Sequence, residues 1–239
     1  MNARAVPLDL GGERLLLLPD RAVAWPARRT LLIADLHLGK GEILRRHGIP
    51  VPRGGTGQDL ARIDRLLGDT GSRRLLVLGD LVHGPGPAQA AWRQRLAAWR
   101  AGRPGLELAV VGGNHDRHGA LDGLGFTELG PVRTEPPFEF SHAPGAGPPG
   151  DGRVRLCGHL HPVLATRDDA GRLRVPVFWL RGDTLVLPAF GALTGGHAVS
   201  ADSGDRLWAA LDEAVLPLPV AAATGLRTGS RKTTQNTDK

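Results

Sequence analysis

The stretch LLIADLH, residues 31–37, decides the fold because an apolar run of four residues ends directly in Asp35 and His37. The pattern returns in LLVLGD (75–80) and AVVGGNHD (109–116). Short apolar runs that end in glycine and polar residues are typical of buried strands. We therefore predict that the first half of the chain is built on strands that each end in a cluster of polar side chains.

Two predicted helices separate these strands. The first begins at Thr56, where TGQD fits a capping box completed by Asp59. Its apolar face contains Leu60, Ile63 and Leu67. The second covers residues 87–100, and its apolar face contains Trp92, Leu96 and Trp99, which we interpret as core residues rather than as a surface for stacked bases. Strands that alternate with helices predict a parallel sheet flanked by helices.

Further strands are predicted at 15–18, 138–140, 154–157, 175–180 and 184–187, so the second half consists mostly of strands and turns. The sequence contains 34 glycines and 19 prolines, which favours a mixed α/β fold with tight connections. Residues 1–220 are predicted to form one domain. The polar stretch 221–239 is predicted to be a disordered tail.

Composition gives only broad limits on function. The net charge of +6 would attract a polyanion, but arginines are spread over the whole chain, so the charge alone indicates little. The single cysteine, Cys157, forms no internal disulfide. No apolar run is long enough for a membrane span or a signal-peptide core, so we expect a cytoplasmic protein with no membrane contact. The sequence makes no prediction about oligomeric state.

Five predicted strands end in side chains that can bind metal. These are Asp35, His37, Asp80, Asn114, His142, His159 and His161. Carboxyl ends of parallel strands meet at one edge of a sheet, so these side chains are expected to gather in one crevice. A mixed oxygen and nitrogen set suits Mn²⁺, Fe, Zn or Co better than Ca²⁺ or Mg²⁺. Seven donors are too many for one tetrahedral ion, which predicts two divalent ions with Asp80 as the bridge.

The separate motifs have simpler explanations. An Asp-x-His sequence after a strand is more often a polar turn, and His142 alone is more often a hydrogen-bonded core histidine. In the pair His159 and His161, two imidazoles flank one residue of a tight turn, an arrangement with few structural uses. The five blocks together predict a dinuclear metal site. Its positive charge would suit a phosphodiester, which gains negative charge when a metal-bridged hydroxide attacks.

Other residues keep two interpretations. Lys40, Arg45 and Arg46 are candidates for contact with substrate phosphates, although a solvated helix face explains them as well. His83 is either a hydrogen-bond partner of the metal site or a loop residue. A glycine pair before the first helix can cradle a phosphate, but a glycine-rich approach to a helix is more common. The small residues of LPAFGALTGG (187–196) suggest close backbone packing at a turn near the site.

The series DLH, GDLV, GNHD, SH and GHLH resembles the signature of the calcineurin-like metallophosphoesterases. This resemblance implies a four-layer αββα sandwich of two packed mixed β-sheets flanked by helices. It places one ion on Asp35, His37, Asp80 and His161, and the other on Asp80, Asn114, His142 and His159. It also makes His115 the group that assists departure of the leaving oxygen, with Asp116 orienting it.

Longer motifs, including ADLHLGKGEILRRHGIPVPRGGT, GNHDR and LPAFGALTGG, resemble the bacterial DNA-ligase-associated (PdeM-like) branch of this family. That resemblance implies a DNA endonuclease of DNA damage repair, with DNA as substrate and an ATP-dependent DNA ligase and a helicase-related protein as partners. Of the metals that suit the donor set, we expect Mn²⁺. The alternatives are a phosphodiesterase or phosphatase for a small nucleotide or a phosphoprotein, and a repair scaffold that has lost catalysis. Intact candidate ligands argue against the scaffold.

Overall fold

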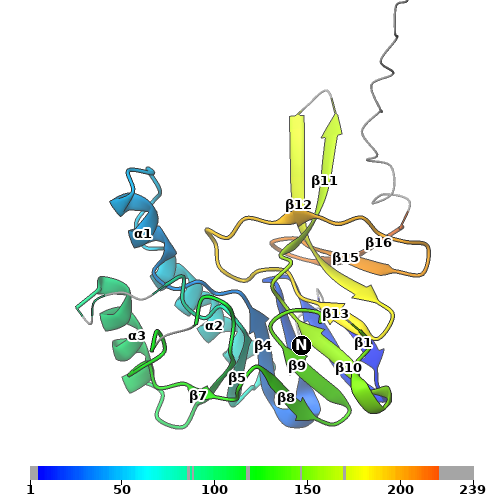
Figure 1. Ribbon diagram of the computed structural model, residues 1–239, viewed down its shortest axis with the longest axis horizontal. Helices are drawn as coiled ribbons and strands as arrows, with labels where there is room; N and C mark the ends of the chain where they lie inside the picture. Colours follow the sequence, from blue (N-terminus) through cyan, green and yellow to red (C-terminus); the bar gives the residue numbers. More distant parts are fainter. Residues whose placement is uncertain are drawn as a thin grey trace, which may run out of the picture.

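The computed structural model describes residues 5–84, 87, 89–116, 119–145, 147–168 and 171–220, and its core is two β-sheets (Figure 1). The predicted tail, residues 221–239, lies outside this range. The first sheet has its strands side by side in chain order: β1 (Val6–Leu10), β2 (Glu13–Leu18), β3 (Ala22–Trp25), β4 (Thr30–Ala34), β5 (Arg74–Leu78), β6 (Glu107–Val111) and β7 (Thr127–Glu128). Strands β4 to β7 are parallel, as predicted for this half.

The second sheet contains β8 (Val132–Glu135), β9 (Phe138–Ser141), β10 (Val154–Cys157), β11 (Pro162–Asp168), β12 (Gly171–Arg181), β13 (Thr184–Val186), β14 (His197–Ala198), β15 (Arg206–Ala210) and β16 (Val215–Leu218). Strand β10 runs parallel to both of its neighbours, β9 and β13. Strands β11 and β12 form the antiparallel hairpin at the top of Figure 1. Both sheets are therefore mixed.

A continuous apolar core lies between the two sheets. It joins Trp25, Leu32 and Leu76 of the first sheet to Phe138 and Phe178 of the second, all of them fully buried. Alternate residues of β4 and β5 face the other way and pack under the helices, as expected for central strands with both faces covered. The predicted fold class, two packed mixed sheets with helices, is confirmed.

The helices are α1 (Lys40–Arg46), α2 (Gly55–Thr70) and α3 (Ala91–Ala101), with 3₁₀ turns η1 (Pro26–Arg28) and η2 (Gly150–Gly152). All three α-helices lie on the side of the first sheet in Figure 1, and α2 and α3 pack on it through Leu60, Ile63 and Trp92. The predicted four-layer αββα arrangement is not complete among the described residues, because no helix of theirs covers the outer face of the second sheet, where a small cluster around Val177 and Leu207 packs instead. None of the described helices is long and apolar enough to cross a bilayer.

The start of α2 corrects one sequence prediction. Its N-cap is Gly54, in the left-handed conformation with φ of 96°, and no side chain caps the helix. Thr56 lies inside the first turn, so the predicted capping box was wrong. Asp59 is buried and accepts hydrogen bonds from Arg62 Nη1 and from the backbone N–H of Ala192. Glycine sets the entry of this helix because it adopts positive φ without steric cost.

Candidate metal centre

All seven predicted ligands lie together beyond the carboxyl ends of β4, β5, β6, β9 and β10. We call Asp35, His37 and His161 the first half of the centre, because one ligand atom of each lies within 4.8 Å of the others. In the second half, formed by Asn114, His142 and His159, His142 Nε2 is 2.8 Å from Asn114 Oδ1 and 3.0 Å from His159 Nδ1.

Asp80 stands between the two halves. Its Oδ2 is 3.7 Å from His37 Nε2 in the first half, and its Oδ1 is 3.5 Å from His142 Nε2 in the second. Asp35 also approaches both halves, with Oδ1 3.2 Å from His161 Nε2 and 3.7 Å from His142 Nδ1. Both carboxylates are buried, so their charges lie in a region of low dielectric, where a cation would be strongly attracted.

The backbone at these residues is strained. Eight non-glycine residues of the described chain have positive φ, and five of them are candidate ligands: Asp35, His37, Asp80, His159 and His161. Each such conformation costs on the order of 1 kcal/mol and persists only where the surroundings enforce it. The left-handed turns aim alternate residues of DLH and HLH toward one point, which identifies this edge of the two sheets as a functional site.

Glycines in the motifs make room for the ligands. A Cβ added to Gly79 would collide with the ring of His142, and one added to Gly158 would collide with the carboxylate of Asp35. In the 187–196 segment, Gly191 lies against the backbone oxygen of Leu36. The expected close backbone packing of that segment near the site is confirmed. This close packing also explains why the 187–196 segment, which has no reactive side chains, is one of the sequence motifs.

The first half fits a divalent cation. Asp35 Oδ1, His37 Nε2 and His161 Nε2 are buried and have no hydrogen-bond partner among the described residues. Burial, followed by the nearby charge of Lys40, lowers the pKa of His37 to about 2, so its imidazole is neutral and offers a lone pair. Buried polar atoms without partners are rare because they are costly. A cation would satisfy all three, and mixed carboxylate and imidazole donors suit a transition-metal ion.

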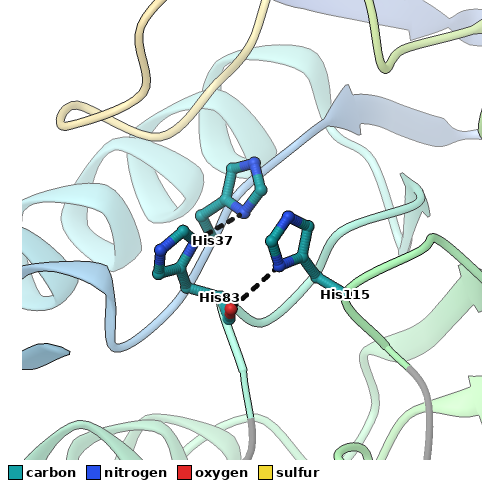
Figure 2. Close-up of side chains that lie close together, drawn as sticks. All are labelled: His37, His83 and His115. Atoms are coloured by element: carbon teal, nitrogen blue, oxygen red, sulfur yellow. Dashed lines mark hydrogen bonds between the residues drawn. The ribbon is translucent and has the colours of Figure 1, made fainter.

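Three histidines meet beside the first half (Figure 2). His115 Nδ1 lies 2.9 Å from the backbone oxygen of His83, so Nδ1 carries a proton and donates a hydrogen bond to that oxygen. The other ring nitrogen, Nε2, is 4.0 Å from Asp80 Oδ2. The His83 ring stacks on His115 and places its Nδ1 3.4 Å from His37 Nδ1. Burial, followed by Lys40, lowers the pKa of His83 to about 4.

Asp116 has different partners from those that the sequence predicted. Its carboxylate accepts hydrogen bonds from the backbone N–H groups of Leu81, Val82 and Gly113, and burial raises its pKa. Among the described residues, it is the backbone oxygen of His83 that contacts the His115 ring nitrogen. Asp116 therefore ties the loop after β5 to the loop after β6, while His83 orients His115. Because any residue carries a backbone oxygen, no sequence signal marks this contact.

Comparison with known proteins agrees with this geometry. Residues 28–168 match the calcineurin-like phosphoesterase family, a range that includes every candidate ligand. This chain belongs to the calcineurin-like phosphoesterase family. It is therefore a metal-dependent phosphoesterase, a hydrolase.

Solved structures extend the likeness. The phosphoesterase is 36% identical to the nuclease MPE of Pseudomonas putida, with a TM-score of 0.77, over 90% of this chain and all of that one. It is 17% identical to the phosphoesterase Yfce of E. coli, with a TM-score of 0.44, over 80% of this chain and 98% of that one. A likeness at that second level carries no information about activity. No curated protein sequence matches the chain.

Two of the three basic residues predicted to contact substrate lie next to the metal centre of the phosphoesterase. Lys40 and Arg45 line a cavity that also touches His37, and burial lowers the pKa of Lys40. Arg45 is held by the backbone oxygens of Val51 and Pro52. Arg46 is exposed on α1 and does not line this cavity.

Proposed function

We propose that this phosphoesterase is a nuclease that hydrolyses phosphodiester bonds of DNA with two divalent ions. The first ion is assigned to Asp35, His37, Asp80 and His161, and the second to Asp80, Asn114, His142 and His159. The observation that carries the proposal is the position of Asp80, within 3.7 Å of a histidine nitrogen in each half. A carboxylate between two sets of imidazoles is what a shared bridging ligand requires.

The chain supplies charge and position to the reaction. Ions bound here would lower the pKa of a water molecule and offset the negative charge of the phosphodiester. The neutral imidazole of His37 and the buried carboxylates of Asp35 and Asp80 would fix the positions of those ions. The left-handed turns hold these ligands in place before the substrate arrives, so no reorganisation is needed during the reaction.

His115 is proposed as the group that helps the leaving oxygen depart. Its side chain is 37% exposed, whereas that of Asp80 beside it is 4% exposed, so the imidazole reaches the solvent-facing side where substrate binds. The hydrogen bond from Nδ1 to His83 fixes the tautomer and leaves Nε2 for the substrate. When protonated, Nε2 donates a hydrogen bond or a proton to the departing oxygen.

Different observations support the narrower parts of the proposal. DNA as the substrate is supported by the similarity to a solved nuclease and by the DNA-ligase-associated motifs. A role in DNA repair and association with a ligase or a helicase-related protein are supported by the motifs alone. Manganese as the ion is supported by the mixed oxygen and nitrogen donors, and a cytoplasmic location by the composition with its single cysteine.

The test is a paired assay of metal-free protein titrated with Mn²⁺. A small chromogenic phosphodiester and a supercoiled plasmid are assayed in parallel, with Asp80→Asn as the control. We expect both substrates to be cleaved by the wild type and neither by the variant. Cleavage of the small ester alone would refute the DNA assignment and favour a nucleotide phosphodiesterase. Cleavage of neither substrate would favour the non-catalytic scaffold.

A further inference from the structure

A cavity of about 300 Å³ adjoins the metal centre at His37. Its walls come from α1, from the first turn of α2, from Arg95 of α3 and from the segment at Leu193. Four basic side chains line it: Lys40, Arg45, Arg53 and Arg95. The cavity therefore joins the catalytic centre to a basic surface.

The acidic residues of the cavity do not neutralise these cations. Glu42 Oε1 accepts the backbone N–H of Trp92, and Asp59 is paired with Arg62, which lies outside the lining. Within the described part of the chain, the side chains of Arg53 and Arg95 form no ion pair and no hydrogen bond.

Several other arginines of the protein do have a carboxylate partner. Arg74, Arg103 and Arg155, for example, each pair with a carboxylate. The two unpaired guanidinium groups that line this cavity are available to an anion from outside the chain.

The first turn of α2 contributes to the same cavity. Gly54, Gly55 and Gly57 carry no side chains, and a Cβ added to Gly54 would meet nothing within 4 Å. The first intrahelical N–H donor is Gln58, which bonds to Gly54, so the N–H groups of the three residues before it have no acceptor within the helix, and these residues line the cavity. A helix N-terminus carries partial positive charge.

Arg95 lies over that positive end. A Cβ added to Gly57 would be 3.3 Å from Arg95 Nη1, which places the guanidinium against the first turn of α2. A cation beside a helix N-terminus is repelled by the helix dipole, and an anion between the two removes the repulsion. An anion in this cavity would therefore be attracted both by the unpaired arginines and by the N-terminus of α2.

We propose that this cavity binds a backbone phosphate of the nucleic acid strand, next to the phosphate that is hydrolysed. Arg53 and Arg95 contact its oxygens, together with the N–H groups of the α2 first turn. The inference rests on the proposed function, because it assigns a second phosphate of the same substrate. It also gives a physical basis for preferring a polynucleotide over a small diester, which has no second phosphate.

The test compares the double variant Arg53→Ala, Arg95→Ala with Arg73→Ala. Arg73 is also exposed and has no carboxylate partner among the described residues, but it precedes β5 at the opposite end from the site. Binding is measured as the fluorescence anisotropy of a labelled phosphorothioate oligonucleotide on the Mn²⁺-loaded protein over a range of salt concentrations. Hydrolysis of a small chromogenic phosphodiester is measured in parallel, and thermal unfolding checks that each variant is folded.

We expect the double variant to bind the oligonucleotide about 10-fold more weakly, with the slope of log affinity against log salt reduced by about 1. Its hydrolysis of the small ester should match that of the wild type. Unchanged oligonucleotide binding, an equal loss in Arg73→Ala, or an equal loss on the small ester would each overturn the inference. Plasmid cleavage by the wild type is scored separately, so cavity-dependent binding without cleavage would refute the nuclease proposal but not the cavity.

Discussion

The two halves of the metal centre are built from the same kinds of side chain but satisfy them differently. In the first half, Asp35 Oδ1, His37 Nε2 and His161 Nε2 are buried without a hydrogen-bond partner among the described residues. In the second half, His142 Nε2 lies within hydrogen-bond distance of both Asn114 and His159. The first half therefore holds buried ligand atoms without a hydrogen-bond partner, although Asp35 Oδ1 approaches His161 Nε2 to 3.2 Å, whereas the ligand atoms of the second half lie within hydrogen-bond distance of one another.

This difference predicts that the two halves bind their ions with different affinities. An unsatisfied buried polar atom costs about 1 to 3 kcal/mol in the folded protein, and an arriving cation recovers that energy. Binding in the second half must first break the contacts between its own ligands. The first half is therefore expected to bind its ion more tightly, and the bridging residue Asp80 couples the two.

Replacing Asp80 by Asn should have the largest effect, because this carboxylate serves both halves. Asn keeps an oxygen that can accept a hydrogen bond from the backbone N–H of His115, as Asp80 Oδ1 does, so the loops after β5 and β6 should stay in place. The lost negative charge should reduce bound metal in both halves and abolish metal-dependent hydrolysis. Metal content by atomic emission, alongside hydrolysis, measures this. Full loading with two ions would show that the halves do not share Asp80.

His115→Ala tests whether the third histidine beside the first half belongs to it. The ring centroid lies 5.1 Å from that of His37, yet Nδ1 of His115 donates a hydrogen bond to the backbone oxygen of His83, and the side chain is 37% exposed. We expect both ions to be retained and kcat to fall by about 10² to 10⁴-fold. Metal content and kcat are measured together. Loss of one ion from this variant would instead mark His115 as a ligand.

The strand ends were predictable from the sequence because the physics is local. LLIADLH and LLVLGD carry both the buried strand and the residues that follow it, and parallel strands bring those ends to one edge. The start of α2 was not predictable in this way. TGQD satisfies a capping pattern, but Asp59 is drawn into the core by Arg62 and Ala192, and Gly54 takes the cap position.

Two features of the site depend on contacts between residues far apart in sequence. The contact between His142 and Asn114 joins loops that come from different sheets, at a distance that only packing decides. The contact of His115 with His83 uses a backbone oxygen, which leaves no trace in the residue types. Motifs can therefore identify ligands but not which ligand atoms are satisfied before metal binds.

A metal titration of the wild type should resolve two affinities, with the second ion about 10-fold weaker, since the one N–H of His142 Nε2, shared between Asn114 Oδ1 and His159 Nδ1, must give up a hydrogen bond of about 1 kcal/mol. Isothermal titration of metal-free protein with Mn²⁺ measures both steps. His161→Ala should remove the tighter step, and His159→Ala should remove the weaker one. Equal affinities in the wild type, or loss of the tighter step in His159→Ala, would show that the free atoms of the first half do not set the order.

The smallest effect is expected for His83→Ala, which tests whether the His83 ring orients the ligand His37 of the first half. The variant keeps the backbone oxygen that orients His115, so only the ring contact with His37 is lost. A hydrogen bond at Nδ1 of His37 would hold the ring so that its Nε2 faces the ion. Such orienting partners are worth about 10- to 100-fold in metal affinity, and the 3.4 Å separation places this one near the lower end. Titration should show weaker binding of the tighter ion, with the weaker ion unchanged.

His83→Gln offers a side-chain oxygen to the same nitrogen and should recover part of the affinity. An equal loss in both variants would assign the effect to lost packing between the His83 and His115 rings rather than to the orientation of His37.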